Sequence, residues 1–204
     1  MTKIKICGLV RPADIAIVNE VLPDYIGFVF AKSKRQISDK LAEELKAMLH
    51  RSISSVGVFV NEDLKRIIYL CNKKIIDFVQ LHGDEDEDYI VKLRTKIGIP
   101  IIKAVRVRSV EDIHRADRID SEYLLLDAFK EDQYGGSGAS FDWSMITKVK
   151  KPYFLAGGIN SDNVLSAIKQ VNPYVIDVSS GVETDGFKDK NKIIDMITKV
   201  RSVK

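Results

Sequence analysis

Two residues of reactive type each stand at the end of a short strand-like run. Cys7 ends the run 3–7 directly before Gly8, and Asp127 follows the apolar run 123–126. A thiolate is a competent base, and a partly buried carboxyl group favours its protonated form and can act as a general acid. Each residue also has a structural alternative, because a lone cysteine often packs as a small apolar side chain and an aspartate often caps a loop or pairs with a lysine.

Two loops of very small residues follow two further apolar runs. The run 153–156 ends in Gly157 and Gly158, and the run 174–178 ends in the sequence Ser-Ser-Gly at 179–181. Such loops expose backbone N–H groups, and a following helix start adds its dipole, so that together they suit a phosphate group. The alternative is that the glycines only make tight turns. Two such loops on neighbouring strands favour a phosphate site.

Other polar residues also fall at expected strand ends, namely Arg35, His82, Arg106 and Asp177. Lys5 and Cys7 share one side of the first strand, because side chains alternate along a strand. An inward Lys5 needs a carboxylate partner, since an unpaired buried charge is costly. Asp177 is the candidate if the first and last strands are neighbours. Contact of Asp177 with a ligand is an equally good expectation.

Strand-like and helical patterns alternate along the whole chain and position these residues. Strands are expected at 3–7, 25–30, 54–60, 76–81, 100–105, 123–127, 153–156 and 174–178. Helices are expected at 12–22, from 38 or 39, at 62–72 behind an Asn61 cap, after the acidic run 84–88, at 110–117, from about 142, at 161–171 and at 189–203. Strict alternation predicts a parallel sheet with right-handed crossovers.

Eight such units close naturally into a single (β/α)8 TIM barrel, here a single domain spanning residues 1–204. An open doubly wound sheet is the alternative, but Gly8 stands alone where that fold usually carries G-x-G-x-x-G. In a barrel the site lies at the carboxyl ends of the strands, which is where the residues above fall.

The composition argues against several functional classes. The 204 residues carry a formal net charge of +3, and the densest basic run, 32–35, is too short to predict a nucleic-acid partner. No apolar stretch approaches the roughly 20 residues that cross a membrane, and the first residues lack a signal-peptide pattern, so a cytoplasmic location is expected. Two cysteines make no disulfide framework, and no Cys/His spacing is typical of a metal site. A monomer and a homodimer are both compatible with the sequence.

Eight motifs occur in the order found in one enzyme family. They are KICG at 5–8, GFVFAKSKR at 27–35, VGVF at 56–59, VQLHG at 79–83, LLLD at 124–127, GGSGASFDW at 135–143, LAGGI at 155–159 and DVSSGVE at 177–183. With this ordered set the chain resembles the phosphoribosylanthranilate isomerase family of tryptophan biosynthesis over nearly its whole length.

The resemblance implies an Amadori rearrangement of a phosphorylated aminoaldose, a small-molecule substrate, without a cofactor or metal. Cys7 resembles the general base and Asp127 the general acid of the family, and Arg35 resembles the residue that holds the anthranilate carboxylate. His82 and Asp177 are expected at the substrate as well. The phosphate-binding residues implied are Gly136, Gly157, Gly158, Ser180 and Gly181, with the loop 135–138 closing over the substrate.

Three other functions are weighed against this interpretation. An indole-glycerol-phosphate synthase would ordinarily show a catalytic lysine on an early strand and an N-terminal extension. A histidine-pathway isomerase would be expected to have an aspartate where Cys7 stands. A non-catalytic phosphate-binding scaffold is disfavoured because Cys7, Asp127 and Arg35 occur together.

Overall fold

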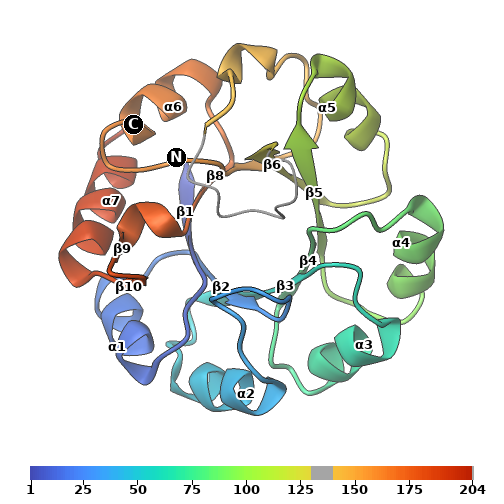
Figure 1. Cartoon of the computed structure of the whole chain (residues 1–204), viewed down its shortest axis with the longest axis horizontal. Helices are drawn as coiled ribbons and strands as arrows, with labels where there is room; N and C mark the ends of the chain where they lie inside the picture. Colours follow the sequence, from blue (N-terminus) through green and yellow to red (C-terminus); the bar gives the residue numbers. More distant parts are fainter. Residues whose placement is uncertain (130–139, 204) are drawn as a thin grey trace.

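Eight parallel strands close into a barrel surrounded by helices (Figure 1). The structure, a computed structural model, describes residues 1–129 and 140–203. Each strand pairs with the next along the chain, and β8 pairs with β1, so the predicted (β/α)8 barrel is confirmed. The strands are β1 (Lys3–Cys7), β2 (Tyr25–Val29), β3 (Ser54–Phe59), β4 (Phe78–Leu81), β5 (Ile101–Val107), β6 (Tyr123–Ala128), β7 (Tyr153–Leu155) and β8 (Val175–Val178).

Seven α-helices cover the barrel in the part of the chain that is described. They are α1 (Pro12–Val21), α2 (Asp39–Met48), α3 (Leu64–Asn72), α4 (Glu87–Arg94), α5 (Val110–Ala116), α6 (Val164–Val171) and α7 (Lys190–Ser202). The helix expected from about residue 142 is a single 3-10 turn, η1 (Trp143–Met145), which Asp142 caps by accepting a hydrogen bond from the Ser144 amide at 2.9 Å. A second 3-10 turn, η2 (Ser180–Val182), and a small hairpin of β9 (Glu183–Thr184) and β10 (Phe187–Lys188) follow β8.

The predicted start of α3 is wrong. The helix begins two residues later than expected, and Asp63 rather than Asn61 caps it by accepting from the Lys65 amide at 2.7 Å. Asn61 instead has a left-handed backbone with φ of 50°, a conformation that asparagine tolerates better than most residues. Its side-chain oxygen accepts from the Asp84 amide at 2.8 Å, so it ties the loop after β3 to the loop after β4.

The predicted start of α6 is also early. The segment 161–163 forms a turn before the helix, in which the side chain of Asn163 accepts from the Asn160 amide at 2.9 Å. The hydrogen bond between these two asparagines therefore forms before the helix, and the helix begins at Val164.

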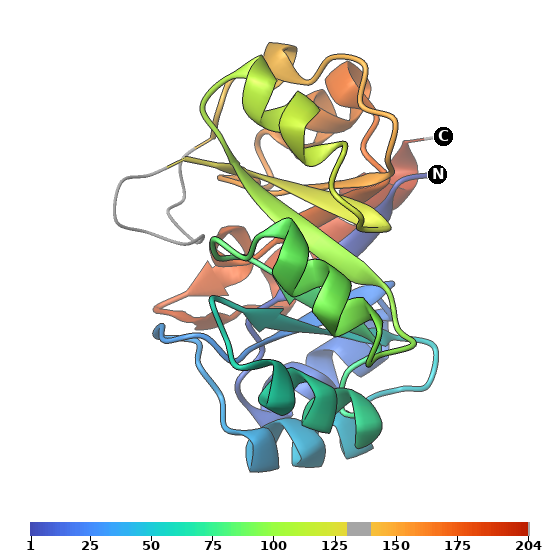
Figure 2. The same cartoon turned by 90° about the vertical axis from the view of Figure 1, so that its right-hand side faces the viewer.

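The lower half of the barrel, toward the amino ends of the strands, is filled by aromatic side chains. Tyr25 lies between Phe78 and Phe154, with ring centroids 5.4 and 5.5 Å away, and Tyr123 packs on Phe154 at 5.8 Å. We call these four residues the aromatic floor. Outward-facing strand residues pack against the helices in a second, larger core. Figure 2 shows the N-terminus at one end of the barrel and the β9–β10 hairpin at the other.

Candidate active site

Four of the residues predicted for the site lie at the carboxyl ends of their strands. Cys7 is the last residue of β1, His82 directly follows β4, and Asp127 and Asp177 lie near the ends of β6 and β8. Because the carboxyl ends of parallel strands share one edge, these residues gather at one mouth of the barrel, the end viewed in Figure 1. Each is at least nine-tenths buried.

The thiol of Cys7 is tightly enclosed by its own strand and by β2. Gly27 is its register partner, and a Cβ added to Gly27 would lie 2.6 Å from the Cys7 sulfur. Burial raises the pKa of the Cys7 thiol, and the positive charges of Lys5 and Lys188 offset only part of that effect. The site therefore holds a neutral thiol with two cations nearby that favour its thiolate form.

The carboxyl group of Asp127 is 3% exposed and is held at both oxygens. Oδ1 accepts from the Ala128 amide at 2.8 Å, and Oδ2 lies 3.2 Å from Nε2 of His82. The loop after β7 packs against this group, since a Cβ on Gly157 would come within 3.0 Å of Oδ1. Asp127 is thus a buried carboxyl group with a fixed orientation, as a directed proton donor requires.

A chain of buried polar side chains crosses the barrel from Asp127 to β8. Beyond His82, the amide nitrogen of Gln80 lies 2.7 Å from His82 Nδ1, and the amide oxygen accepts from Lys5 Nζ at 3.0 Å. Lys5 also donates to Asp177 Oδ2 at 2.9 Å, which confirms the predicted ion pair between the first and last strands. Burial opposes the charge on Lys5, but the carboxylate of Asp177 outweighs it and raises the lysine pKa.

Gln80 was not among the residues predicted for the site. The signal was present, because Gln80 stands two residues before His82 and alternate strand residues face the same side.

Asp177 has one carboxylate oxygen that can still accept a hydrogen bond. Its Oδ1 is buried without a hydrogen-bond partner among the described residues.

Arg35 reaches the mouth from the loop after β2 and is held by Glu183, which was not predicted for the site. Its Nε and Nη2 donate to the two carboxylate oxygens of Glu183 at 2.7 and 2.8 Å. Lys188 donates to the same carboxylate at 2.6 Å and to the Ser179 carbonyl at 3.0 Å. The side chain of Arg35 crosses Gly8, because a Cβ added to Gly8 would lie 2.4 Å from Arg35 Cδ. Arg35 therefore passes beside Cys7, the residue before Gly8.

The two loops predicted to bind phosphate are packed against each other. Gly157 and Gly158 have φ values of 78° and 63°, a backbone that other residues rarely adopt. A Cβ on Gly181 would come within 2.1 Å of the Ile159 carbonyl oxygen, so the turn after β8 needs glycine to approach the loop after β7. Ser180 begins the 3-10 turn η2 beside it. Gly136 and the loop 135–138 lie outside the described residues.

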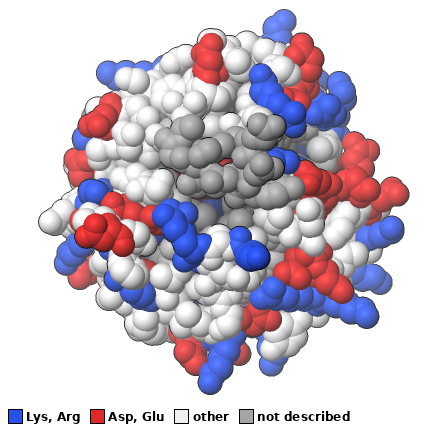
Figure 3. Space-filling view, in the orientation of Figure 1, with Lys and Arg blue, Asp and Glu red and all other residues white. Residues whose placement is uncertain are grey.

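Charged side chains of both signs surround this mouth. Figure 3 views the same end as Figure 1 and shows Lys and Arg side chains close to its centre as well as along its rim. Arg106, at the end of β5, donates to Asp84 at 2.9 Å and lies over the ring of Phe129. Cations at the mouth suit an anionic ligand.

Residues 4–199 match the family model described as N-(5'phosphoribosyl)anthranilate (PRA) isomerase. The N-(5'-phosphoribosyl)anthranilate isomerase of Endomicrobium trichonymphae is 49% identical over 203 residues, with all of both chains covered. The chain belongs to the N-(5'-phosphoribosyl)anthranilate isomerase family. The family resemblance found in the sequence is therefore confirmed.

Solved structures of this isomerase family share the whole fold. The phosphoribosyl anthranilate isomerase of Thermotoga maritima is 36% identical, with all of both chains covered and a TM-score of 0.90. Another structure of a phosphoribosyl anthranilate isomerase, also 36% identical and fully covered with a TM-score of 0.86, is a complex with reduced 1-(o-carboxyphenylamino)-1-deoxyribulose 5-phosphate. The barrel of this chain is thus a fold on which other members of the isomerase family are built.

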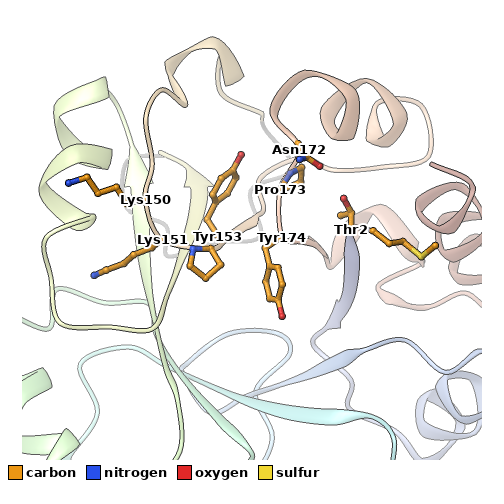
Figure 4. Close-up of a pocket in the computed structure, with 9 residues that line it drawn as sticks. Thr2, Lys150, Lys151, Tyr153, Asn172, Pro173 and Tyr174 are labelled. Carbon is orange, nitrogen blue, oxygen red and sulfur yellow. The ribbon is translucent and has the colours of Figure 1, made fainter. Parts of the chain in front are cut away.

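A cavity of about 460 Å³ lies at the opposite end of the barrel, where Thr2 precedes β1 and Tyr174 precedes β8 (Figure 4). Figure 4 shows Lys150 and Lys151 beside it on the segment leading into β7. None of the residues predicted for the isomerase site lines this cavity.

Within residues 1–129 and 140–203, no cluster of His, Cys, Asp and Glu is arranged to hold a metal ion, and no helix has the length and apolar character to cross a membrane.

Proposed function

We propose that the chain converts N-(5-phosphoribosyl)anthranilate to 1-(2-carboxyphenylamino)-1-deoxyribulose 5-phosphate, the third step of tryptophan biosynthesis from chorismate. The observation that carries the proposal is the placement of a buried thiol and a buried carboxyl group, Cys7 and Asp127, on non-adjacent strands of one barrel mouth. The isomerisation needs a base and an acid that act on one sugar from different sides. Membership of the isomerase family supports the same reaction.

Asp127 is proposed to start the reaction as the general acid. Its proton passes to the furanose ring oxygen, the bond from that oxygen to C1 breaks, and the ring opens to an iminium ion. The carboxylate left behind is stabilised by the Ala128 amide and by His82, the two groups within hydrogen-bonding distance of its oxygens. A buried carboxylate with two hydrogen-bond donors is a stable product of proton transfer.

Cys7 is proposed to act next as the general base. The thiolate removes the proton from C2, and the electron pair of the C–H bond moves toward the iminium nitrogen to give an enolamine, which tautomerises to the aminoketose. The iminium ion is the electron sink for this step. The charges of Lys5 and Lys188 favour the thiolate that the step requires, against the effect of burial.

The remaining predicted residues are proposed to bind the two anionic ends of the substrate. Arg35 uses Nε and Nη2 for Glu183, so its Nη1 edge can take the anthranilate carboxylate. Backbone N–H groups near Gly157, Gly158, Ser180 and Gly181 are proposed to bind the phosphate, with Gly136 on the loop that would cover it. Asp177 can contact the sugar through Oδ1, and His82 acts at the substrate through Asp127. A monomer and a homodimer both remain compatible with this proposal.

The decisive experiment follows the fluorescence of N-(5-phosphoribosyl)anthranilate with the purified chain. We expect rapid consumption by the wild type and a loss of at least about 1,000-fold in kcat for Cys7→Ala and for Asp127→Ala, since each removes an acid–base group. Circular dichroism should show both variants folded. Near wild-type rates in both variants would overturn the assigned roles, and no turnover by the folded wild type would overturn the function.

A further inference from the structure

The buried chain that joins Lys5, Gln80, His82 and Asp127 contains one side chain whose orientation decides the others. Gln80 is 1% exposed and lies between a lysine ammonium group and an imidazole ring. An amide side chain has one accepting end and one donating end, so it cannot treat both neighbours alike. The direction in which it points therefore determines what His82 presents to Asp127.

Lys5 determines that direction. An ammonium group only donates hydrogen bonds, so the group 3.0 Å from Lys5 Nζ must be the accepting oxygen of Gln80. The Asp177 carboxylate at 2.9 Å, on the neighbouring strand β8, keeps Lys5 charged in spite of its complete burial. A reversed amide would place two sets of N–H donors against each other.

With its oxygen on Lys5, Gln80 turns its NH2 group toward His82. The distance from Gln80 Nε2 to His82 Nδ1 is 2.7 Å, so Nδ1 must be the unprotonated, accepting nitrogen. The ring proton is then on Nε2, which lies 3.2 Å from Asp127 Oδ2. A proton on Nδ1 would face the amide N–H of Gln80, so this contact selects the Nε2–H tautomer.

We propose that Gln80, oriented by Lys5, is a positioning residue that holds His82 as the neutral Nε2–H tautomer facing Asp127. The inference rests on the proposed function, because its consequence concerns the general acid. The Nε2–H donor fixes the orientation of the Asp127 carboxyl group and is already in place to donate to the carboxylate once its proton has been transferred.

Each ring nitrogen of His82 faces one polar side chain. Gln80 faces Nδ1 from β4, and Asp127 faces Nε2 from β6. On β5, between those strands, Arg106 is the register partner of Asp127, and its charge is paired with Asp84. Lys5, behind Gln80, is paired with Asp177.

The tautomer is measured directly by two-bond ¹H–¹⁵N correlation spectra of the full chain labelled with [¹⁵N]histidine, without substrate. The chain has three histidines, and the His82 signals are assigned by their loss in His82→Asn. At about pH 8 we expect the Nε2–H pattern for His82 in the wild type, while exposed His50 and His114 serve as internal references. A protonated Nδ1 in the wild type would overturn the proposal.

Two substitutions test whether Gln80 is responsible. Gln80→Glu places an accepting oxygen at Nδ1, so we expect Nδ1 to be protonated and kcat to fall at least about tenfold with KM changed less than about threefold. Gln80→Met removes the amide at similar volume, so we expect both neutral tautomers of His82 to be populated. Gln170→Glu, at an exposed position of α6, adds the same charge and should leave both spectrum and rate unchanged.

The outcomes separate this inference from the proposed function. If His82 keeps the wild-type pattern in both Gln80 variants, the positioning role is wrong whatever the activity. If Gln80→Glu fails to fold, the wild-type spectrum and Gln80→Met still decide the question. If the tautomer behaves as expected but the wild type does not turn over N-(5-phosphoribosyl)anthranilate, the positioning role stands and the proposed function is wrong.

Discussion

Glu183 binds the guanidinium of Arg35 through two parallel hydrogen bonds of 2.7 and 2.8 Å across 148 residues of sequence. Burial raises the pKa of Glu183, but the hydrogen bonds from Arg35 and Lys188 outweigh it, so that the net pKa is lowered and the group stays a carboxylate. The hydrogen bond that Arg35 donates to Glu183 in turn raises the pKa of Arg35. The pair holds Arg35 beside Cys7 before any ligand binds, which makes the arginine a preorganised group.

The first prediction concerns this pair. In Glu183→Gln the amide can accept at only one atom, so Arg35 should lose its fixed orientation, and we expect KM for N-(5-phosphoribosyl)anthranilate to rise about tenfold, or about 1.4 kcal/mol. Steady-state fluorescence kinetics measure it. Asp39→Asn is the control, because Asp39 holds Arg66 in a similar way on the outside of the barrel at 2.7 Å. An unchanged KM in Glu183→Gln would show that the pair does not position Arg35.

The second prediction concerns the space around Cys7. Gly27→Ala places a methyl group 2.6 Å from the sulfur and 3.1 Å from Cys7 Cα, so the thiol must shift. We expect the free energy of unfolding to fall by about 1–3 kcal/mol and kcat by at least about tenfold. Gly98→Ala is the matched control, since a Cβ there meets no atom within 4 Å among the described residues. Urea titration and kinetics measure both, and a fully active Gly27→Ala would contradict the expected crowding.

The third prediction separates the structural and ligand-binding roles of Asp177. Asp177→Ala leaves the ammonium of Lys5 fully buried without its carboxylate, which should cost about 3–5 kcal/mol of unfolding free energy. Adding Lys5→Met should restore much of that stability but not activity. Glu44→Ala breaks an exposed pair with Lys40 at 4.0 Å and should cost less than about 0.5 kcal/mol. A loss of unfolding free energy below about 1 kcal/mol in Asp177→Ala would contradict a stabilising role for the buried ion pair.

The fourth prediction concerns alkaline pH. Burial raises the pKa of Tyr153 to about 12, above an unfolded value of about 10. Its contribution to stability is therefore complete below pH about 10 and is lost as pH rises through about 12. Between pH about 8 and about 11 the wild type should lose about 1.4 kcal/mol more of unfolding free energy than Tyr153→Phe does. Tyr69→Phe, at an exposed position, should behave like the wild type. Equal losses in wild type and Tyr153→Phe would refute the assignment.

Much of the fold was predictable because strand and helix patterns alternate strictly along the sequence of a parallel barrel. The same topology explains why Cys7, His82, Asp127 and Asp177 could be expected together: strand ends share a face whatever the sequence distance. Helix starts were less predictable. At Asn61 a local capping preference competed with a bond to the next loop, and only the tertiary contact decides such cases.

The partners of the site residues were the harder part. Gln80 sits in an apolar run and carries no charge, so only its alternation with His82 marked it. Glu183 and Lys188 lie on the turn and hairpin after β8, where no periodicity relates them to Arg35. Their contacts depend on loop geometry and side-chain reach, which a single sequence does not encode in a readable pattern. Gly136 stays a prediction.

The aromatic floor has a consequence for isotope experiments on this enzyme. Leu125 and Phe154 within the barrel are fully shielded from solvent. The rings of Tyr25 and Phe78 close the space beneath the row of buried polar side chains that runs from Asp127 to Asp177. Deuterons from heavy water would then reach the thiol and the acid only from the mouth, where the sugar would also enter. A bound substrate would block that route. A hydrogen removed from the sugar should therefore return to the sugar more often than it exchanges with solvent.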